Sequence, residues 1–153
     1  MKTIRLFPLE FGRLLQNRLT WLMILLTVIS PAAGLFLYKP ATATTMLSLY
    51  LANPAIAGGV VGGILFGLLT IFELDRVSRS RADVLMDAAV SPLTMALVRL
   101  LALLAVAVVT VALTMLVWLP ISMRLIGSVF DGMDYVLAYL LLMGLALPLS
   151  ILA

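Results

Sequence analysis

The sequence contains no cysteine and no histidine, and only 11% of its 153 residues are charged. Without cysteine there is no disulfide framework and no thiolate nucleophile. Without histidine the commonest general base and metal ligand is missing. The chain is instead 64% hydrophobic, with a mean hydropathy of +1.23, whereas a soluble domain is about 45–50% apolar and about 25% charged. This composition excludes a soluble globular domain and predicts an all-α, polytopic bundle of membrane helices.

Four long apolar stretches predict membrane spans, at about 19–38, 54–72, 94–119 and 135–153, and Arg99 in the third is their one charged residue. The first has twenty residues, enough to cross a hydrocarbon core of roughly 30 Å. We expect Pro31 to kink this helix, Pro54 to begin the second span and Pro120 to end the third. The last span reaches Ala153 with no polar tail. We therefore expect the protein to continue beyond this residue, the alternative being that the span is terminal.

Residues 1–18 carry the pattern of an amphipathic helix that lies in the membrane surface. Apolar side chains share one side of this predicted helix: Ile4, Phe7, Phe11, Leu14 and Leu15. Basic and polar side chains share the other side: Lys2, Arg5, Arg13 and Gln16. We expect an interfacial helix with its basic side toward lipid headgroups. The alternative is the frayed start of the first span, because Pro8 and Gly12 both weaken a helix.

The second predicted span contains a glycine-rich run. Its glycines recur at spacings of four residues, the small-xxx-small pattern of closely packed membrane helices. They are Gly58, Gly59, Gly62, Gly63 and Gly67. Because no Lys-Ser or Lys-Thr pair follows, the run does not match a nucleotide-binding loop. We expect these glycines to let two helix backbones approach closely.

The segment 73–92, between the second and third spans, holds four of the seven acidic residues. A charge at the bilayer centre costs roughly 2.5–3.5 kcal/mol, so this segment must lie in water. Opposite charges at 73/76, 75/79 and 79/83 favour a short helix. Apolar residues could form a seam along it: Leu74, Val77, Val84, Leu85 and Ala88. Such a seam suits docking on a partner protein. The alternative is a solvated loop whose arginines only fix the topology.

The basic residues are distributed unequally between the two sides of the predicted membrane. Eight of the ten lie on the side of the charged segment: Lys2, Arg5, Arg13, Arg18, Arg76, Arg79, Arg81 and Arg99. Only Lys39 and Arg124 lie on the other side. Because Lys and Arg accumulate in cytoplasmic loops, we expect a multi-pass protein of the plasma or inner membrane. Its amino terminus and charged loop would lie in the cytoplasm.

The chain resembles the permeases of ABC exporters of the second type, the ABC-2 class. In that family an acidic residue closes the second span, a mixed-charge stretch and a short helix follow, and a proline motif precedes the third span. Here Glu73 stands at the acidic position and Ser91-Pro92-Leu93-Thr94 matches the proline motif. Arg99-Leu-Leu-Ala matches the basic start of the third span. Many members carry Gly-Thr where this chain reads Arg81-Ala-Asp-Val, so the register of the coupling helix stays open.

The resemblance implies the transmembrane subunit of an ATP-binding cassette transporter, acting as an exporter. A cytoplasmic partner subunit would bind ATP and Mg and hydrolyse the ATP. The chain itself would be no enzyme and would bind no cofactor, metal or nucleic acid. It would pair in the lipid bilayer with a second copy or a sister permease. The residues that contact the ATPase would be Glu73, Arg76, Arg79, Arg81, Asp83, Val84, Leu85 and Asp87.

Two other classes of function stay open. An ion-coupled transporter or channel without an ATPase usually carries an ionisable residue within a span, and the central parts of all four predicted spans are uncharged. An intramembrane enzyme needs polar groups that face one another. The spans offer only scattered hydroxyl residues: Thr27, Ser30, Thr70, Thr110, Thr114 and Ser150. Such hydroxyls more often bond carbonyls of their own or a neighbouring helix.

Overall fold

The structure, a computed structural model, describes residues 2–37, 48–79 and 92–153. These residues are almost entirely helical, with no strand among them. The elements in chain order are α1 (Lys2–Gln16), α2 (Arg18–Ile29), α3 (Pro31–Leu37), η1 (Ser48–Ala52), α4 (Asn53–Arg79), α6 (Pro92–Ile126), η2 (Gly127–Val129) and α7 (Gly132–Leu152). The predicted all-α class is confirmed.

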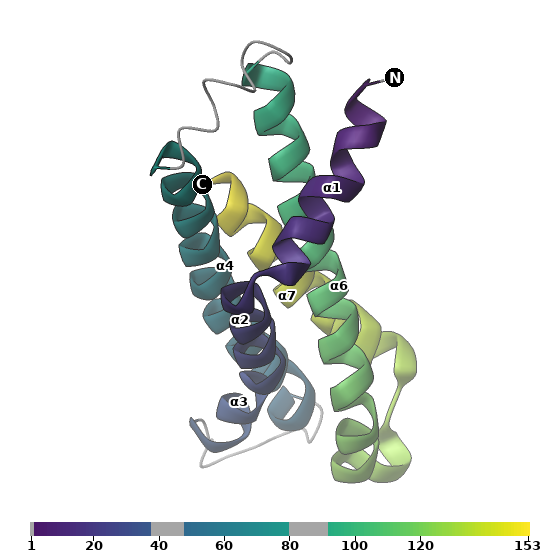
Figure 1. Cartoon of the computed structure of the whole chain (residues 1–153). Helices are drawn as coiled ribbons and strands as arrows, with labels where there is room; N and C mark the ends of the chain where they lie inside the picture. Colours follow the sequence, from purple (N-terminus) through teal and green to yellow (C-terminus); the bar gives the residue numbers. More distant parts are fainter. Residues whose placement is uncertain (1, 38–47, 80–91) are drawn as a thin grey trace.

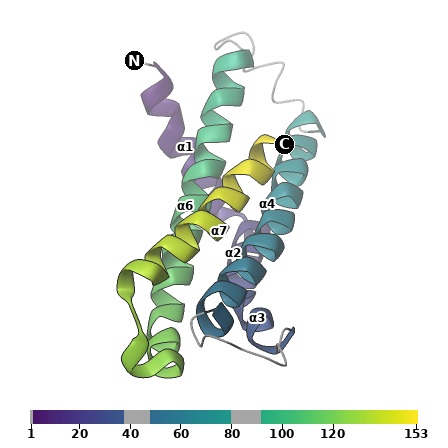
Figure 2. The ribbon, with the colours of Figure 1, turned by 180° about the vertical axis from the view of Figure 1, so that it is seen from behind.

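Four segments are long and apolar enough to cross a membrane: Arg18–Phe36, Tyr50–Arg76, Leu93–Val129 and Gly132–Leu152. They pack into a bundle (Figure 1). Helix α2 contacts α4 and α6, and α7 contacts the same two helices. Figure 2 shows α7 crossing between α4 and α6. The contact between α4 and α7 is the most extensive in the bundle. This arrangement indicates a multi-pass membrane protein.

The prolines have different effects on the helices. Helix α2 ends at Ile29 and α3 begins at Pro31, so the first span is interrupted next to the proline at which a kink is expected. Pro54 lies in the first turn of α4, as expected. The prediction that Pro120 ends the third span is wrong, because α6 continues through it to Ile126. A membrane helix tolerates proline where neighbouring groups compensate for the lost hydrogen bond.

The end of α6 is set by a glycine. Gly127 follows the last helical residue with φ of 68°, the left-handed conformation that commonly terminates helices and that glycine adopts without strain. After η2, the Asp131 side chain caps α7 by accepting a hydrogen bond from the Met133 N–H at 2.8 Å. The segment between the last two spans is therefore shorter than the predicted 120–134.

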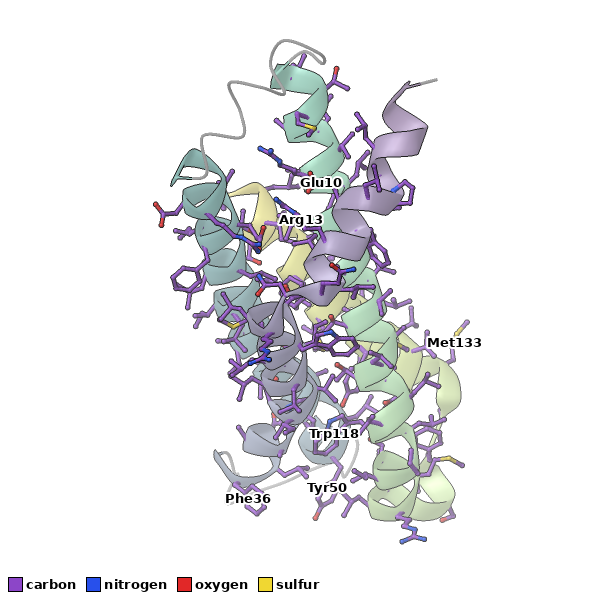
Figure 3. The ribbon with its side chains drawn as sticks, viewed as in Figure 1. Glu10, Arg13, Phe36, Tyr50, Trp118 and Met133 are labelled. Atoms are coloured by element: carbon purple, nitrogen blue, oxygen red, sulfur yellow. The ribbon has the colours of Figure 1, made fainter. Side chains whose placement is uncertain are left out.

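The side chains of Trp118 and Tyr135 each form a hydrogen bond to the backbone of another helix. The Trp118 indole N–H of α6 donates to the Val28 carbonyl of α2 at 2.8 Å. Figure 3 shows Trp118 between these two helices. The Tyr135 hydroxyl of α7 donates to the Met115 carbonyl of α6 at 2.6 Å. Both side chains are buried, so each bond satisfies a polar group that would otherwise face an apolar core.

Six Ser and Thr side chains of the spans bond their own helices. Each of the six donates to a carbonyl three or four residues earlier, at 2.7–2.9 Å: Thr27, Ser30, Thr70, Thr110, Thr114 and Ser150. This confirms the expectation for these residues.

Candidate functional site: a charged junction of four helices

Helix α1 packs against the first part of α6. In Figure 1 it rises beside α6 toward the end of the bundle where α4 ends and α6 begins. Leu14 is buried, and Phe7 and Phe11 pack partly against the core. The apolar side predicted for this helix therefore covers α6 in part. Glu10 is also buried, although it is charged.

Two buried glutamates share one arginine at this junction. Glu10 of α1 is 7% exposed and Glu73 of α4 is 5% exposed. The Arg13 Nη2 atom lies 2.9 Å from Glu10 Oε2 and 3.0 Å from Glu73 Oε2. Figure 3 shows Glu10 and Arg13 on the side of α1 that faces α4 and α6. Burying a carboxylate without a partner is costly, and Arg13 is the partner that these two buried glutamates share.

Asn17, in the corner between α1 and α2, forms a hydrogen bond with Glu73 of α4. Its Nδ2 donates to Glu73 Oε1 at 2.9 Å, while its Oδ1 accepts from the Leu19 N–H at 3.1 Å and caps α2. The Trp21 indole N–H donates to the Leu15 carbonyl at 2.6 Å across the corner. One residue thus ends one helix, begins the next and holds both to α4.

Two further arginines complete the site. The predicted pair of Glu73 and Arg76 is present, with 3.6 Å between Oε1 and Nη1. Arg99 of α6 lines one small cavity together with Glu10, Arg13 and Glu73. We call this set, Glu10, Arg13, Asn17, Glu73, Arg76 and Arg99, the charged junction. It brings together α1, α2, α4 and α6.

The charged junction is continuous with the segment predicted to bind an ATPase. Helix α4 does not end at Phe72 but runs on without interruption to Arg79. Glu73 and Arg76 therefore belong to the helix that leads into residues 80–91. The backbone of Arg79 ends α4, and its side chain lies outside the described part. The other predicted contact residues lie outside the described residues altogether: Arg81, Asp83, Val84, Leu85 and Asp87.

The glycine run of α4 lies where this helix meets its neighbours. A Cβ atom on Gly59 would lie 2.5 Å from the Leu142 carbonyl oxygen of α7. A Cβ on Gly62 would lie 2.8 Å from both Leu147 Cδ1 and Thr27 Cγ2. These positions have no room for a side chain without movement.

The other three glycines of the run differ in how closely they are packed. A Cβ on Gly58 would lie 3.1 Å from Met143 Sδ. On Gly63 and Gly67 the nearest atoms would be 3.7 Å and 3.6 Å away, which is ordinary contact. The close approach of α4 and α7 therefore depends on the first part of the run.

Of the charged junction, sequence reasoning assigns only Glu73 and Arg76 to a site. It predicts Arg13 on the headgroup side of the first helix and Arg99 only at the start of the third span, and it misses Glu10 and Asn17. Glu10 precedes Arg13 by three residues, the spacing of a helical ion pair, and it is the only acid in the first 72 residues. Asn17 directly precedes the first uncharged run, where asparagine is a preferred helix cap. Both patterns can be read from the sequence.

Comparison with protein-family models, with curated proteins and with solved structures gives no significant match. The function is therefore argued from the geometry and the sequence pattern.

Proposed function

We propose that this chain is the transmembrane permease subunit of an ATP-binding cassette transporter, and that it acts as an exporter. ATP and Mg are bound, and ATP is hydrolysed, by a separate cytoplasmic subunit that docks on the 73–92 segment. The observation that carries the proposal is the charged junction, which ties α1, the α1–α2 corner and α6 to the helix that leads into this segment. A force applied to the segment therefore reaches several helices at once.

The geometry indicates how such a force would be transmitted. Glu73 lies on α4 and is held by Arg13 of α1 and Asn17 of the α1–α2 corner. Sliding α4 past α1 would separate the Glu73 carboxylate, whose side chain is 6% exposed, from its Arg13 partner. Leaving a buried carboxylate without its partner is unfavourable. Helix α4 would instead move together with α1 and the start of α2. The tight glycine contact at Gly59 would pass this movement to α7.

The distribution of basic residues supports a cytoplasmic location for the charged junction. Arg13, Arg18, Arg76 and Arg99 lie near this end of the bundle, whereas Arg124 lies near the end of α6 at the opposite end (Figure 1). With the positive-inside rule, this distribution supports an amino terminus in the cytoplasm and a location in the plasma or inner membrane. A second copy or a sister permease would complete the transporter.

Purification in mild detergent tests the proposal. We expect mass spectrometry to identify a soluble ATP-binding subunit bound to the wild-type chain. The double substitution Val84→Asp and Leu85→Asp should release it, because a docking seam would then carry two new charges. As the matched control, Val129→Asp with Met133→Asp changes two exposed apolar residues at the opposite end and should leave the complex intact. Equal recovery of an ATPase with all three proteins, or none with the wild type, would contradict the proposal.

An ion-coupled transporter is the second candidate, and one observation favours it. Glu10 and Glu73 are buried carboxylates that line the same small cavity, and such groups are frequent proton or ion sites in membrane proteins. Transport in sealed vesicles separates the two candidates. Transport that needs ATP and survives a protonophore supports the permease, whereas transport that stops with the protonophore and proceeds without ATP supports ion coupling.

A further inference from the structure

An open hollow lies beside the charged junction, where the α1–α2 corner faces α4. Three arginines from three different helices line it: Arg13 of α1, Arg18 at the start of α2 and Arg76 of α4. The hollow is also lined by one amide side chain and two apolar side chains, Asn17, Leu19 and Phe72. The lining of the hollow thus combines basic and apolar side chains.

The positive charge of this hollow is only partly neutralised within the described part of the chain. Glu73 is its one acidic lining residue, and that carboxylate is already held by Arg13 and Asn17. Arg76 is a distant partner of Glu73, at 3.6 Å, and its side chain is 54% exposed. Arg18 is exposed and makes no ion pair with a described side chain. Two guanidinium groups therefore remain available to an anion from outside.

The apolar side chains of the lining decide which kind of anion fits. Phe72 is 48% exposed, and Leu19, which also lines the hollow, begins the apolar run of α2. A free anion would leave these two side chains uncovered, whereas a phospholipid would place its phosphate between the arginines and its acyl chains along the apolar helices. Arginine binds phosphate oxygens through paired N–H donors, and basic pockets between membrane helices suit anionic headgroups.

We propose that this hollow binds the phosphate headgroup of an anionic phospholipid through Arg18 and Arg76. A bound lipid would bridge α2 and α4 next to the Asn17–Glu73 hydrogen bond, so it would reinforce the attachment of the α1–α2 corner to α4. The proposal does not depend on an ATPase partner. The leaflet in which the lipid lies follows from the orientation argued above.

Native mass spectrometry of the full chain in detergent tests this site, with added phosphatidylglycerol and phosphatidylcholine as probes. We expect the wild type to bind phosphatidylglycerol more tightly than phosphatidylcholine. Arg18→Gln with Arg76→Gln should weaken phosphatidylglycerol binding by about thirty-fold, since each basic residue contributes about five-fold. The lysine variant, Arg18→Lys with Arg76→Lys, keeps both charges and should retain most of the affinity. Arg124→Gln removes a charge from the opposite end and should change nothing.

The same experiment distinguishes a lipid from a soluble phosphate. Glycerol 1-phosphate carries the phosphate without acyl chains, and we expect it not to displace phosphatidylglycerol at equal concentration. Displacement by glycerol 1-phosphate as effective as that by unlabelled phosphatidylglycerol would overturn the assignment to a lipid. Unchanged phosphatidylglycerol binding in the glutamine variant, or equal binding of the two lipids by the wild type, would overturn the site itself.

Discussion

Two neighbouring glycines of α4 give a matched test of how closely this helix packs on α7. In Gly59→Ala the new Cβ would lie 2.5 Å from the Leu142 carbonyl oxygen and 3.2 Å from its carbon, whereas ordinary contacts begin at 3.4 Å. Both atoms belong to the backbone, so no side-chain rotation relieves the overlap. The helices must separate by roughly 1 Å, and overpacking of this kind costs typically about 1–3 kcal/mol.

Gly63→Ala is the control, because it makes the same change one turn later on the same helix. Its Cβ would lie 3.7 Å from the Ala146 carbonyl oxygen, which needs no movement. Both substitutions gain the same helix propensity, about 1 kcal/mol, so the difference between the two variants isolates the overlap. We expect Gly63→Ala to be as stable as the wild type or more stable, and Gly59→Ala to be about 1–3 kcal/mol less stable than Gly63→Ala.

Thermal unfolding in detergent, followed by tryptophan fluorescence, measures this difference. For a chain of this size each kcal/mol shifts Tm by roughly 2–4 °C. Equal Tm values for the two alanine variants would refute the close approach of α4 and α7 at Gly59, and with it the route by which movement of α4 reaches α7.

Three further predictions concern hydrogen bonds and ion pairs. Glu73→Gln should lower the free energy of unfolding by about 1–3 kcal/mol. The loss is smaller than for a fully buried pair, because Arg13 still pairs with Glu10 and is partly exposed to solvent. A combined Arg13→Glu and Glu73→Arg swap that recovers none of a single variant's loss would contradict the pairing of Arg13 with Glu73. Asn17→Ala should lower the free energy of unfolding by about 1 kcal/mol for the lost helix cap and by a further amount for the lost hydrogen bond to Glu73, as measured by the same thermal unfolding. A decrease no larger than that of a helix cap alone would show that the bond to Glu73 does not contribute to stability. Trp118→Phe removes the bond to the Val28 carbonyl and should cost about 1 kcal/mol, with unchanged stability counting against that bond.

The spans could be predicted because lipid imposes simple rules on a sequence. A long uncharged run must form its backbone hydrogen bonds internally, so the four spans follow from apolar length alone. The break at Pro31 and the start at Pro54 follow from the missing proline N–H. The own-helix bonds of hydroxyls such as Thr110 follow from the absence of water as an alternative partner.

The features that sequence reasoning missed depend on contacts between distant segments. Pro120 reads as a helix end, yet α6 continues because the left-handed turn occurs only at Gly127. Glu10 is buried although it is charged, and its partner Arg13 also pairs with Glu73 of the distant helix α4. Gly34 was not singled out, although a Cβ there would overlap the Asn53 carbonyl oxygen. No local pattern states which helix will lie opposite a given residue.

Photo-cross-linking from the charged segment tests most directly whether a cytoplasmic ATPase docks there. A photoreactive phenylalanine analogue would replace Leu85 in the predicted docking seam, and in a matched protein it would replace Val129, which is 62% exposed at the opposite end of the bundle. After irradiation of intact cells, we predict that the chain modified at residue 85 is cross-linked to an ATP-binding subunit and that the chain modified at residue 129 is not. An ATP-binding subunit captured from neither position, or equally from both, would contradict the permease account.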